Sequence, residues 1–160
     1  MGKEDLILRE IKKALKDISE GKSRKLVKEI VDAKKISVIG HGRSWHVAKS
    51  FAMRLKHLGL DVGNVGNKNL TIVLSGSGET KDILKIVKKI KKGRIICITA
   101  QEDSHIAKEA DLIIEVRARR SKQPMRSLFE QSALVYLDGI VIKLMKELKI
   151  SEKEMWKKHD

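Results

Sequence analysis

The chain has 160 residues, of which 41% are hydrophobic and 35% are charged, and its formal net charge is +14. This length fits one domain over 1–160 with a real core, and no apolar run approaches the roughly 18 residues that a membrane-spanning helix needs. The single cysteine, Cys97, excludes an internal disulfide framework, and the charged N-terminal stretch lacks the features of a signal peptide, so we expect a cytoplasmic protein.

The excess of lysine and arginine raises the question of a nucleic-acid partner. The basic residues are scattered over the polar positions of helical patterns, and aromatic residues make up only 3% of the chain, so few side chains can stack on bases. We interpret the charge as heat adaptation and as attraction to small anions. A nucleic-acid-binding module is the weaker alternative.

Hydrophobic periodicity predicts two amphipathic helices within 1–33, separated by a break at Gly21. From residue 36 onward, short apolar runs alternate with helical repeats. The runs predict strands at 36–39, 62–65, 70–74, 94–99 and 112–116, and the repeats predict helices at 44–58, 82–91, 106–109 and 127–149. Such alternation is typical of an α/β fold, here a three-layer αβα sandwich over 36–160 with a five-stranded parallel sheet. Ligands of such sheets bind beyond the carboxyl ends of the strands, where Gly40 and Ser75 fall.

The run 70–74 leads directly into Ser75-Gly76-Ser77-Gly78-Glu79-Thr80, and a helical repeat follows. The first turn of a helix has N–H groups without partners and attracts anions. Glycines allow close backbone approach, and the hydroxyls of Ser75, Ser77 and Thr80 can donate to phosphate oxygens. Because the P-loop lysine is absent, we predict a phosphate site without a magnesium-bound nucleotide. The alternative is an empty turn in which Ser77 or Thr80 caps the helix.

A second glycine turn, Gly40-His41-Gly42-Arg43-Ser44-Trp45, follows the first expected strand. A dinucleotide fingerprint would need a third glycine where Trp45 stands, which argues against that interpretation. We expect Ser44 to cap the next helix and Arg43 to reach a carboxylate, carbonyl or phosphate oxygen. The two turns are placed to converge on one ligand.

Glu130 lies on the apolar stripe of the expected helix 127–149, so it should face the core. Burial favours the neutral form of a carboxyl group and suits it to proton transfer near neutrality. Ser127-x-x-Glu130 also fits a capping box, which is the alternative interpretation. The five histidines, His159 among them, show no spacing typical of a zinc site, and we expect no cofactor.

Together, the segment 40–59, the 75–80 turn, Leu128-Phe129-Glu130 and Lys158-His159 resemble the sugar isomerase (SIS) domain family, and within it the archaeal 6-phospho-3-hexuloisomerases. The similarity runs from about residue 36 to the end of the chain. It implies a flavodoxin-like fold, with the N-terminal helices packed between the subunits of a homodimer or homotetramer. It also implies that Glu130 is catalytic, that His159 is the family's C-terminal histidine, and that the sugar phosphate is held by Ser44, Ser75, Ser77 and Thr80. Arg43 and Gly76 complete the expected binding residues.

The implied reaction interconverts 3-hexulose 6-phosphate and fructose 6-phosphate through an enediol, a step of the ribulose monophosphate pathway. Glu130 would be the base, and His159 or Arg43 would assist ring opening or stabilise the enediolate, without a metal. The chain departs from the family's usual pattern at His41, at Trp45, in the short 66–70 loop and at 125–127. A non-catalytic sugar-phosphate sensor is therefore the alternative. The basic loop 117–122 is either a flexible surface or a lid over an anion.

Overall fold

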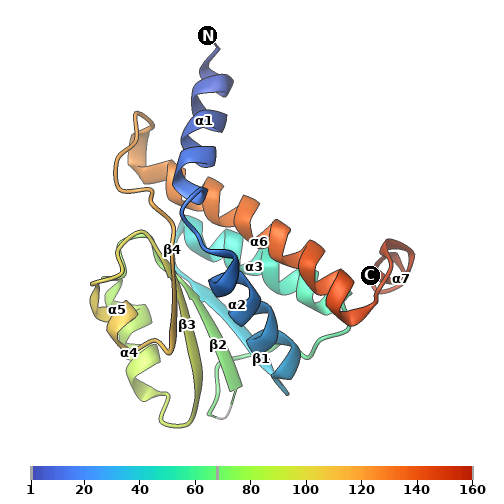
Figure 1. Ribbon diagram of the computed structural model, residues 1–160. Coiled ribbons are helices and arrows are strands. Elements are labelled where there is room, and N and C mark those ends of the chain that lie inside the picture. The colour runs from blue at the N-terminus through green and yellow to red at the C-terminus, as the bar shows by residue number, and fades with distance from the viewer. Residues whose placement is uncertain (1, 68, 160) are drawn as a thin grey trace.

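The computed structural model describes residues 2–67 and 69–159 (Figure 1). The expected helices are all present, with ends shifted by a few residues. Gly21 does not separate the first two helices, because the second begins before it and is capped by the Ser19 side chain, which accepts the Lys22 N–H. Two short elements were not expected, the 3₁₀-helix η1 and the helix α7. In chain order the elements are α1 (Lys3–Leu15), α2 (Glu20–Asp32), β1 (Ile36–Gly40), α3 (Arg43–His57), β2 (Asn69–Leu74), α4 (Lys81–Lys89), β3 (Gly93–Thr99), α5 (His105–Lys108), β4 (Leu112–Glu115), η1 (Pro124–Arg126), α6 (Ser127–Leu148) and α7 (Glu152–Trp156).

The sheet has four parallel strands in the order β1-β2-β3-β4, so the prediction of five strands was wrong. The expected strand at 62–65 is reduced to one parallel bridge between Ile36 and Val62. Gly63 lies within this short segment and Gly66 follows it, and glycine disfavours strand structure. The Ile36 N–H donates to the Asp61 carbonyl, and the Ile36 carbonyl accepts the Gly63 N–H. The neighbouring Lys35 carbonyl accepts an N–H of β2, so the bridge lies on the outer edge of β1. Lys68, in the expected short 66–70 loop, lies outside the described residues.

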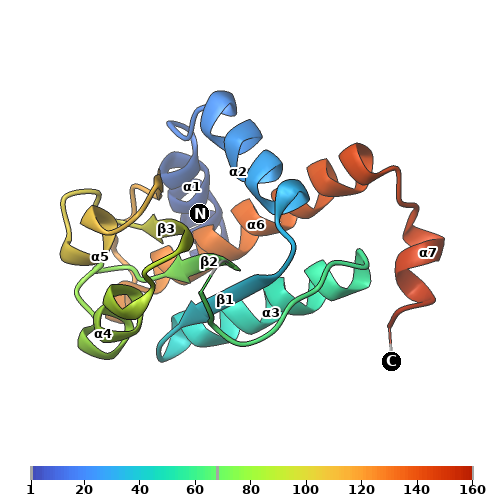
Figure 2. The same cartoon turned by 90° about the horizontal axis from the view of Figure 1, so that it is seen from below.

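Helices cover both faces of the sheet. A larger apolar cluster packs α2, α3 and α6 against one face, and a smaller one packs α4 and α5 against the other. Figures 1 and 2 show α4 and α5 across the sheet from α2 and α6. Successive side chains of β2 point to opposite faces of the sheet, which explains why there are two clusters. Ile72 faces the larger cluster and Val73 faces the smaller one. Cys97 is buried in the smaller cluster as expected, and burial raises the pKa of its thiol to about 12.

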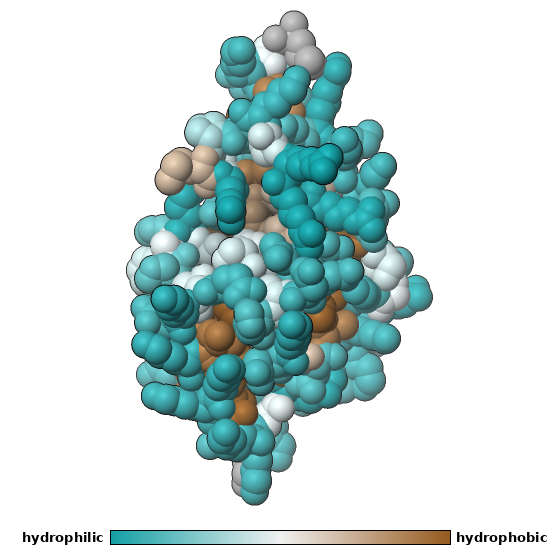
Figure 3. Space-filling view, turned by 90° about the vertical axis from the view of Figure 1, so that its left-hand side faces the viewer, coloured by the Kyte–Doolittle hydropathy of each residue, from teal (hydrophilic) through white to brown (hydrophobic). Residues whose placement is uncertain are grey.

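The surface is dominated by charged side chains. The face that carries α4 and α5 is mostly hydrophilic, with small apolar areas between the charges (Figure 3). Within 2–67 and 69–159, every helix is too short or too polar to cross a membrane. Helix α1 extends away from the sheet and packs on α6, and Ala14 is its one buried residue.

Candidate functional site

The two glycine turns begin side by side at the carboxyl edge of the sheet. β1 and β2 are neighbours, and Gly40 pairs with Leu74, so both turns leave the sheet at the same level. The start of α6 packs on the second turn, because a Cβ added at Gly76 would meet Phe129 Cδ1 at 3.0 Å. The segments 40–45, 75–80 and 127–130 therefore form one region.

The turn after β2 has its carbonyl groups directed away from that region. The Gly76 carbonyl accepts the Ala100 N–H (3.1 Å), and the Gly78 carbonyl accepts the Ile106 N–H (3.0 Å). Helix α4 then begins at Lys81, and the side chain of its N-cap residue, Thr80, makes no capping hydrogen bond. Because the first bond of the helix is from the Leu84 N–H to the Thr80 carbonyl (2.9 Å), the N–H groups of 81–83 have no intrahelical partner. This geometry suits a phosphate.

The hydroxyl groups of the turn form a network under it. Ser75 is buried, and its Oγ accepts the Gly78 N–H and lies 3.1 Å from Thr80 Oγ1. Ser77 Oγ accepts the Glu79 N–H at 3.1 Å. The predicted serines and threonine are thus brought together, but Ser75 and Thr80 shape the turn from inside, and Ser77 reaches the adjoining pocket.

Glu79 is the one acidic residue of the 75–80 turn, and its carboxylate points to α5. Oε1 accepts the His105 N–H at 3.0 Å, and Oε2 lies 2.6 Å from His105 Nδ1. The bond from the His105 N–H, followed by that with the imidazole, lowers the pKa of Glu79. A negative charge that would repel a phosphate is therefore held to one side of the turn.

A pocket of about 340 Å³ lies between the turn and the start of α6. This volume is at the small end of ligand sites, which suits a molecule of hexose phosphate size. The lining of the pocket includes Gly76 and Ser77 from the turn and Glu130 from α6. The remaining lining residues are Ala100, Gln101, Ala118, Arg119, Met125, Arg126 and Phe129.

The Glu130 side chain is 16% exposed, and its Oε2 is buried without a hydrogen-bond partner among the described residues. Arg43 Nε lies 3.8 Å from that oxygen, and Arg43 Nη1 donates to Ser127 Oγ at 3.1 Å. As predicted, Arg43 reaches a carboxylate. The Glu130 carboxylate, which belongs to a residue lining the pocket and lies beside a cation, is a candidate for proton exchange with a bound molecule.

The capping-box alternative for Glu130 was wrong. Arg126, in a left-handed conformation, occupies the N-cap position of α6, and Ser127 is already inside the helix. The Ser127 hydroxyl donates to the Pro124 carbonyl at 2.9 Å instead. Glu130 therefore has no role in closing the helix end.

The turn after β1 also differs from expectation. Gly42, with φ of +58°, is the N-cap of α3, so Ser44 is not a cap. Ser44 is buried in the first turn of the helix and does not line the pocket. In a dinucleotide fold, the third glycine lets the helix pack closely on the strand. Here Gly40 allows the close packing of strand and helix, because a Cβ at Gly40 would meet the Ser44 carbonyl oxygen at 2.7 Å. Trp45 is 45% exposed and, with His41, lines a separate open hollow.

His159 lies at the other end of the molecule from the pocket. Its ring is 5.1 Å from that of His57 and 5.2 Å from that of Trp156. Burial, followed by the nearby His159 and Arg54, lowers the pKa of His57. The part of α6 from Glu130 to Leu148, about 27 Å at 1.5 Å per residue, separates Glu130 from this cluster. One chain therefore does not bring His159 and Glu130 together.

The sequence interpretation missed Arg119 and Arg126 as pocket residues. Arg119 Nε donates to the Ala100 carbonyl at 2.8 Å, and its Nη2 lies 3.3 Å from Asp103 Oδ1. Arg126 has a φ of +59°, which is unusual for a residue with a side chain. The basic run at 117–122 indicated that Arg119 could meet an anion. Which residues lie next to Arg119 becomes apparent only in the fold.

The chain is similar to known sugar-phosphate isomerases. The SIS domain model matches residues 60–137. A 3-hexulose-6-phosphate isomerase of Methanocaldococcus jannaschii is 39% identical over 145 residues, covering 84% of this chain and 80% of the relative. That of Bacillus subtilis is 35% identical over 172 residues, covering 96% and 93%.

A solved structure agrees with these relatives. It is a hypothetical protein from Methanococcus jannaschii, for which a molecular function of 3-hexulose-6-phosphate isomerase was inferred. It matches with a TM-score of 0.90 and 34% identity, covering 100% of this chain and 98% of that one. Similarity at this level over most of both chains shows that the chain belongs to the SIS domain family.

Proposed function

We propose that the protein is an isomerase that interconverts 3-hexulose 6-phosphate and fructose 6-phosphate. The observation that carries this proposal is the position of Glu130, a residue with a partly buried carboxylate that lines the same pocket as Gly76 and Ser77. The phosphate of the substrate binds at the turn, and the reacting carbons then lie toward Glu130. Relatives with this activity in their names, at 35–39% identity, support the choice of sugar.

The chemistry needs one mobile proton and a site that tolerates an enediolate. A base removes the proton from C2 of the 3-ketose, and the electron pair moves to O3 to give the 2,3-enediolate. Return of a proton to C3 and transfer of the hydroxyl proton from O2 to O3 leave the carbonyl group at C2. Glu130 is the proposed base, and the Arg43 guanidinium, 3.8 Å from Oε2, is placed to stabilise the developing negative charge.

We also propose that the protein assembles as a homodimer or homotetramer in which His159 serves the pocket of another copy. The length of α6 between His159 and Glu130 within one chain supports this arrangement. Large apolar side chains that remain exposed, such as Leu8, Met53 and Ile142, also support it, because a second copy would cover them.

The second candidate function is sugar-phosphate binding without turnover. It is favoured by the position of Ser44, which the family resemblance assigns to phosphate binding and which is buried away from the pocket. Such a protein would keep the phosphate turn and bind the sugar phosphate, but it would not move the proton.

The test is incubation of the protein with fructose 6-phosphate in D₂O, with NMR detection of the 3-ketose and of deuterium uptake at carbon. We expect Glu130→Gln to lower turnover by about 10²–10⁴-fold, the usual contribution of a positioned base, while calorimetry shows unchanged phosphate binding. Glu147→Gln, an exposed change on the same helix, is the matched control. Full activity of Glu130→Gln would refute the proposed base. Binding without turnover in the wild type would favour the second candidate.

A further inference from the structure

Loop 117–126 connects β4 to α6 and contains no regular element except η1. It nevertheless contributes Ala118, Arg119, Met125 and Arg126 to the lining of the pocket. The position of this loop therefore decides the shape of the pocket on the side away from the phosphate turn.

The loop is held by a single carboxylate from the N-terminal helix. Glu10 on α1 accepts hydrogen bonds from three consecutive loop residues. Its Oε1 accepts the Lys122 N–H at 2.9 Å, and its Oε2 accepts from Ser121 Oγ at 2.8 Å and from Gln123 Nε2 at 2.9 Å. The Lys122 N–H, followed by the Gln123 and Ser121 side chains, lowers the pKa of Glu10, so the carboxylate is ionised at neutral pH.

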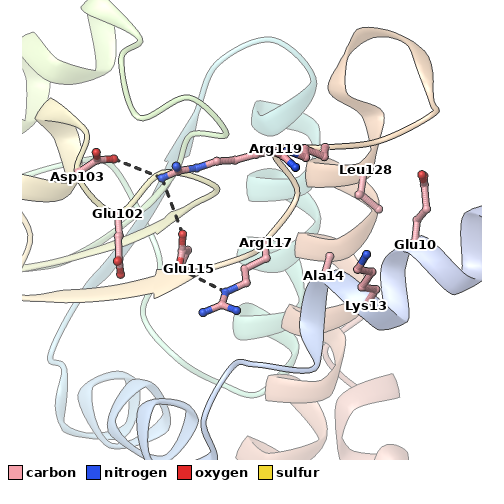
Figure 4. A pocket seen from close by; sticks show the side chains of 10 residues that line it. Glu10, Lys13, Ala14, Glu102, Asp103, Glu115, Arg117, Arg119 and Leu128 are labelled. Atoms are coloured by element: carbon pink, nitrogen blue, oxygen red, sulfur yellow. Dashed lines mark hydrogen bonds and ion pairs between the residues drawn. The ribbon is translucent and has the colours of Figure 1, made fainter.

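A second contact fixes the beginning of the loop to the end of the same helix. The Arg117 N–H donates to the Ala14 carbonyl at 3.1 Å, and Arg117 Nη1 lies 2.7 Å from Asp17 Oδ2. Figure 4 shows a neighbouring hollow, distinct from the pocket beside the phosphate turn, whose lining includes Glu10 and Ala14 of α1 and Arg117 and Arg119 of the loop. The segment 10–17 thus binds the loop at two points, and the basic loop is not a free flexible surface.

The two walls of the pocket are held by different parts of the chain. The phosphate turn is bonded to β3 and α5 through the carbonyls of Gly76 and Gly78. The loop part of the lining is bonded to α1, more than 100 residues away in the sequence, through residues 121–123, while Arg119 is also bonded to the Ala100 carbonyl and to Asp103. Loss of the Glu10 contacts should therefore disturb one wall and leave the other intact.

We propose that Glu10 is a positioning residue for the sugar end of the site, which it controls by fixing loop 117–126 and with it Arg119 and Arg126. This inference rests on the proposed function, because it assumes that a sugar phosphate occupies the pocket. Glu10 itself does not line the pocket beside the phosphate turn.

The first measurement needs no ligand. Hydrogen exchange of the full chain is compared between wild type, Glu10→Ala and Glu4→Ala, where Glu4 is an exposed acidic residue of α1 outside these loop contacts. We expect faster exchange over 121–126 in Glu10→Ala and no change in Glu4→Ala. Unchanged exchange in Glu10→Ala would overturn the proposal whatever the protein binds.

The second measurement separates the two ends of the ligand. By calorimetry, Glu10→Ala should weaken fructose 6-phosphate binding by about threefold to tenfold and leave the affinity for inorganic phosphate within twofold. Glu10→Gln, which keeps one acceptor oxygen, should fall between wild type and Glu10→Ala. Equal loss for both ligands, or no loss for either, would overturn the positioning role. A wild type that binds phosphate but not fructose 6-phosphate would refute the proposed function, while the exchange result would still decide whether Glu10 holds the loop.

Discussion

The two glycine turns at the carboxyl edge of the sheet look alike in sequence, but they differ in what surrounds them. After β2, bonds to β3 and α5 hold the carbonyls of Gly76 and Gly78 and the carboxylate of Glu79. After β1, Gly42 opens the helix and Trp45 turns outward into an open hollow. We therefore expect an anion to bind at the turn after β2, where neighbouring elements hold the acceptor groups to one side.

The largest expected difference between the turns is in the variants Gly78→Ala and Gly42→Ala. Both glycines have positive φ, +66° and +58°, so alanine costs about 1–2 kcal/mol of backbone strain at either position. A Cβ at Gly78 would also overlap Ser104 Oγ and Cβ, whereas one at Gly42 meets nothing within 4 Å. We expect Gly78→Ala to lower the affinity for inorganic phosphate by about tenfold or more, and Gly42→Ala to lower only the Tm, by about 2–8 °C. Calorimetry and thermal unfolding measure both, and equal phosphate affinity of the two variants would contradict the distinction.

A smaller effect is expected at Glu79, where the carboxylate is tied to α5. The His105 N–H lowers the pKa of Glu79, so its folded-state pKa lies below the unfolded value of about 4.3. Its contribution to stability is therefore present above about pH 4.3 and is lost as the pH falls through the lowered pKa. We expect Glu79→Gln to have a lower Tm than wild type at pH 7, and this difference should close toward pH 3. Glu102→Gln, on the nearby loop, is the control, and a Tm difference that does not vary with pH would contradict the role of the Glu79 carboxylate.

Local sequence patterns were sufficient to predict most of the fold. Apolar runs between glycine turns correctly predicted four strands, but the run at 62–65 supports only the bridge at Val62. Helix α7 was missed although Ser151 and Glu154 form a capping box there. The same pattern at Ser127 was misleading, because Arg126 adopts a positive φ and becomes the N-cap in place of Ser127. The identity of an arginine side chain does not predict a positive φ.

The site was predictable where one segment supplies it. Gly76, Ser77 and Glu130, which the sequence places at a strand end and on a helix stripe, line the pocket, and their binding and catalytic roles stay predictions. The Glu10 contact with Gln123 joins residues 113 apart, so local pattern carries no signal for it. The family resemblance assigned His159 to the site, but it lies with His57 at the far end of α6.

The smallest expected effect is at Trp45, an indole that would narrow the site if the two turns shared one ligand. Its ring instead lies 5.0 Å from that of His46, with Lys49 Nζ 4.5 Å from its centroid, and it does not line the pocket. Trp45→Ala should therefore change the affinity for fructose 6-phosphate by less than about twofold, and the lost cation–π contact should lower stability by about 0.5–1 kcal/mol. Calorimetry and denaturant unfolding measure the two quantities. A tenfold change in affinity, in either direction, would mean that the Trp45 indole itself contacts the ligand.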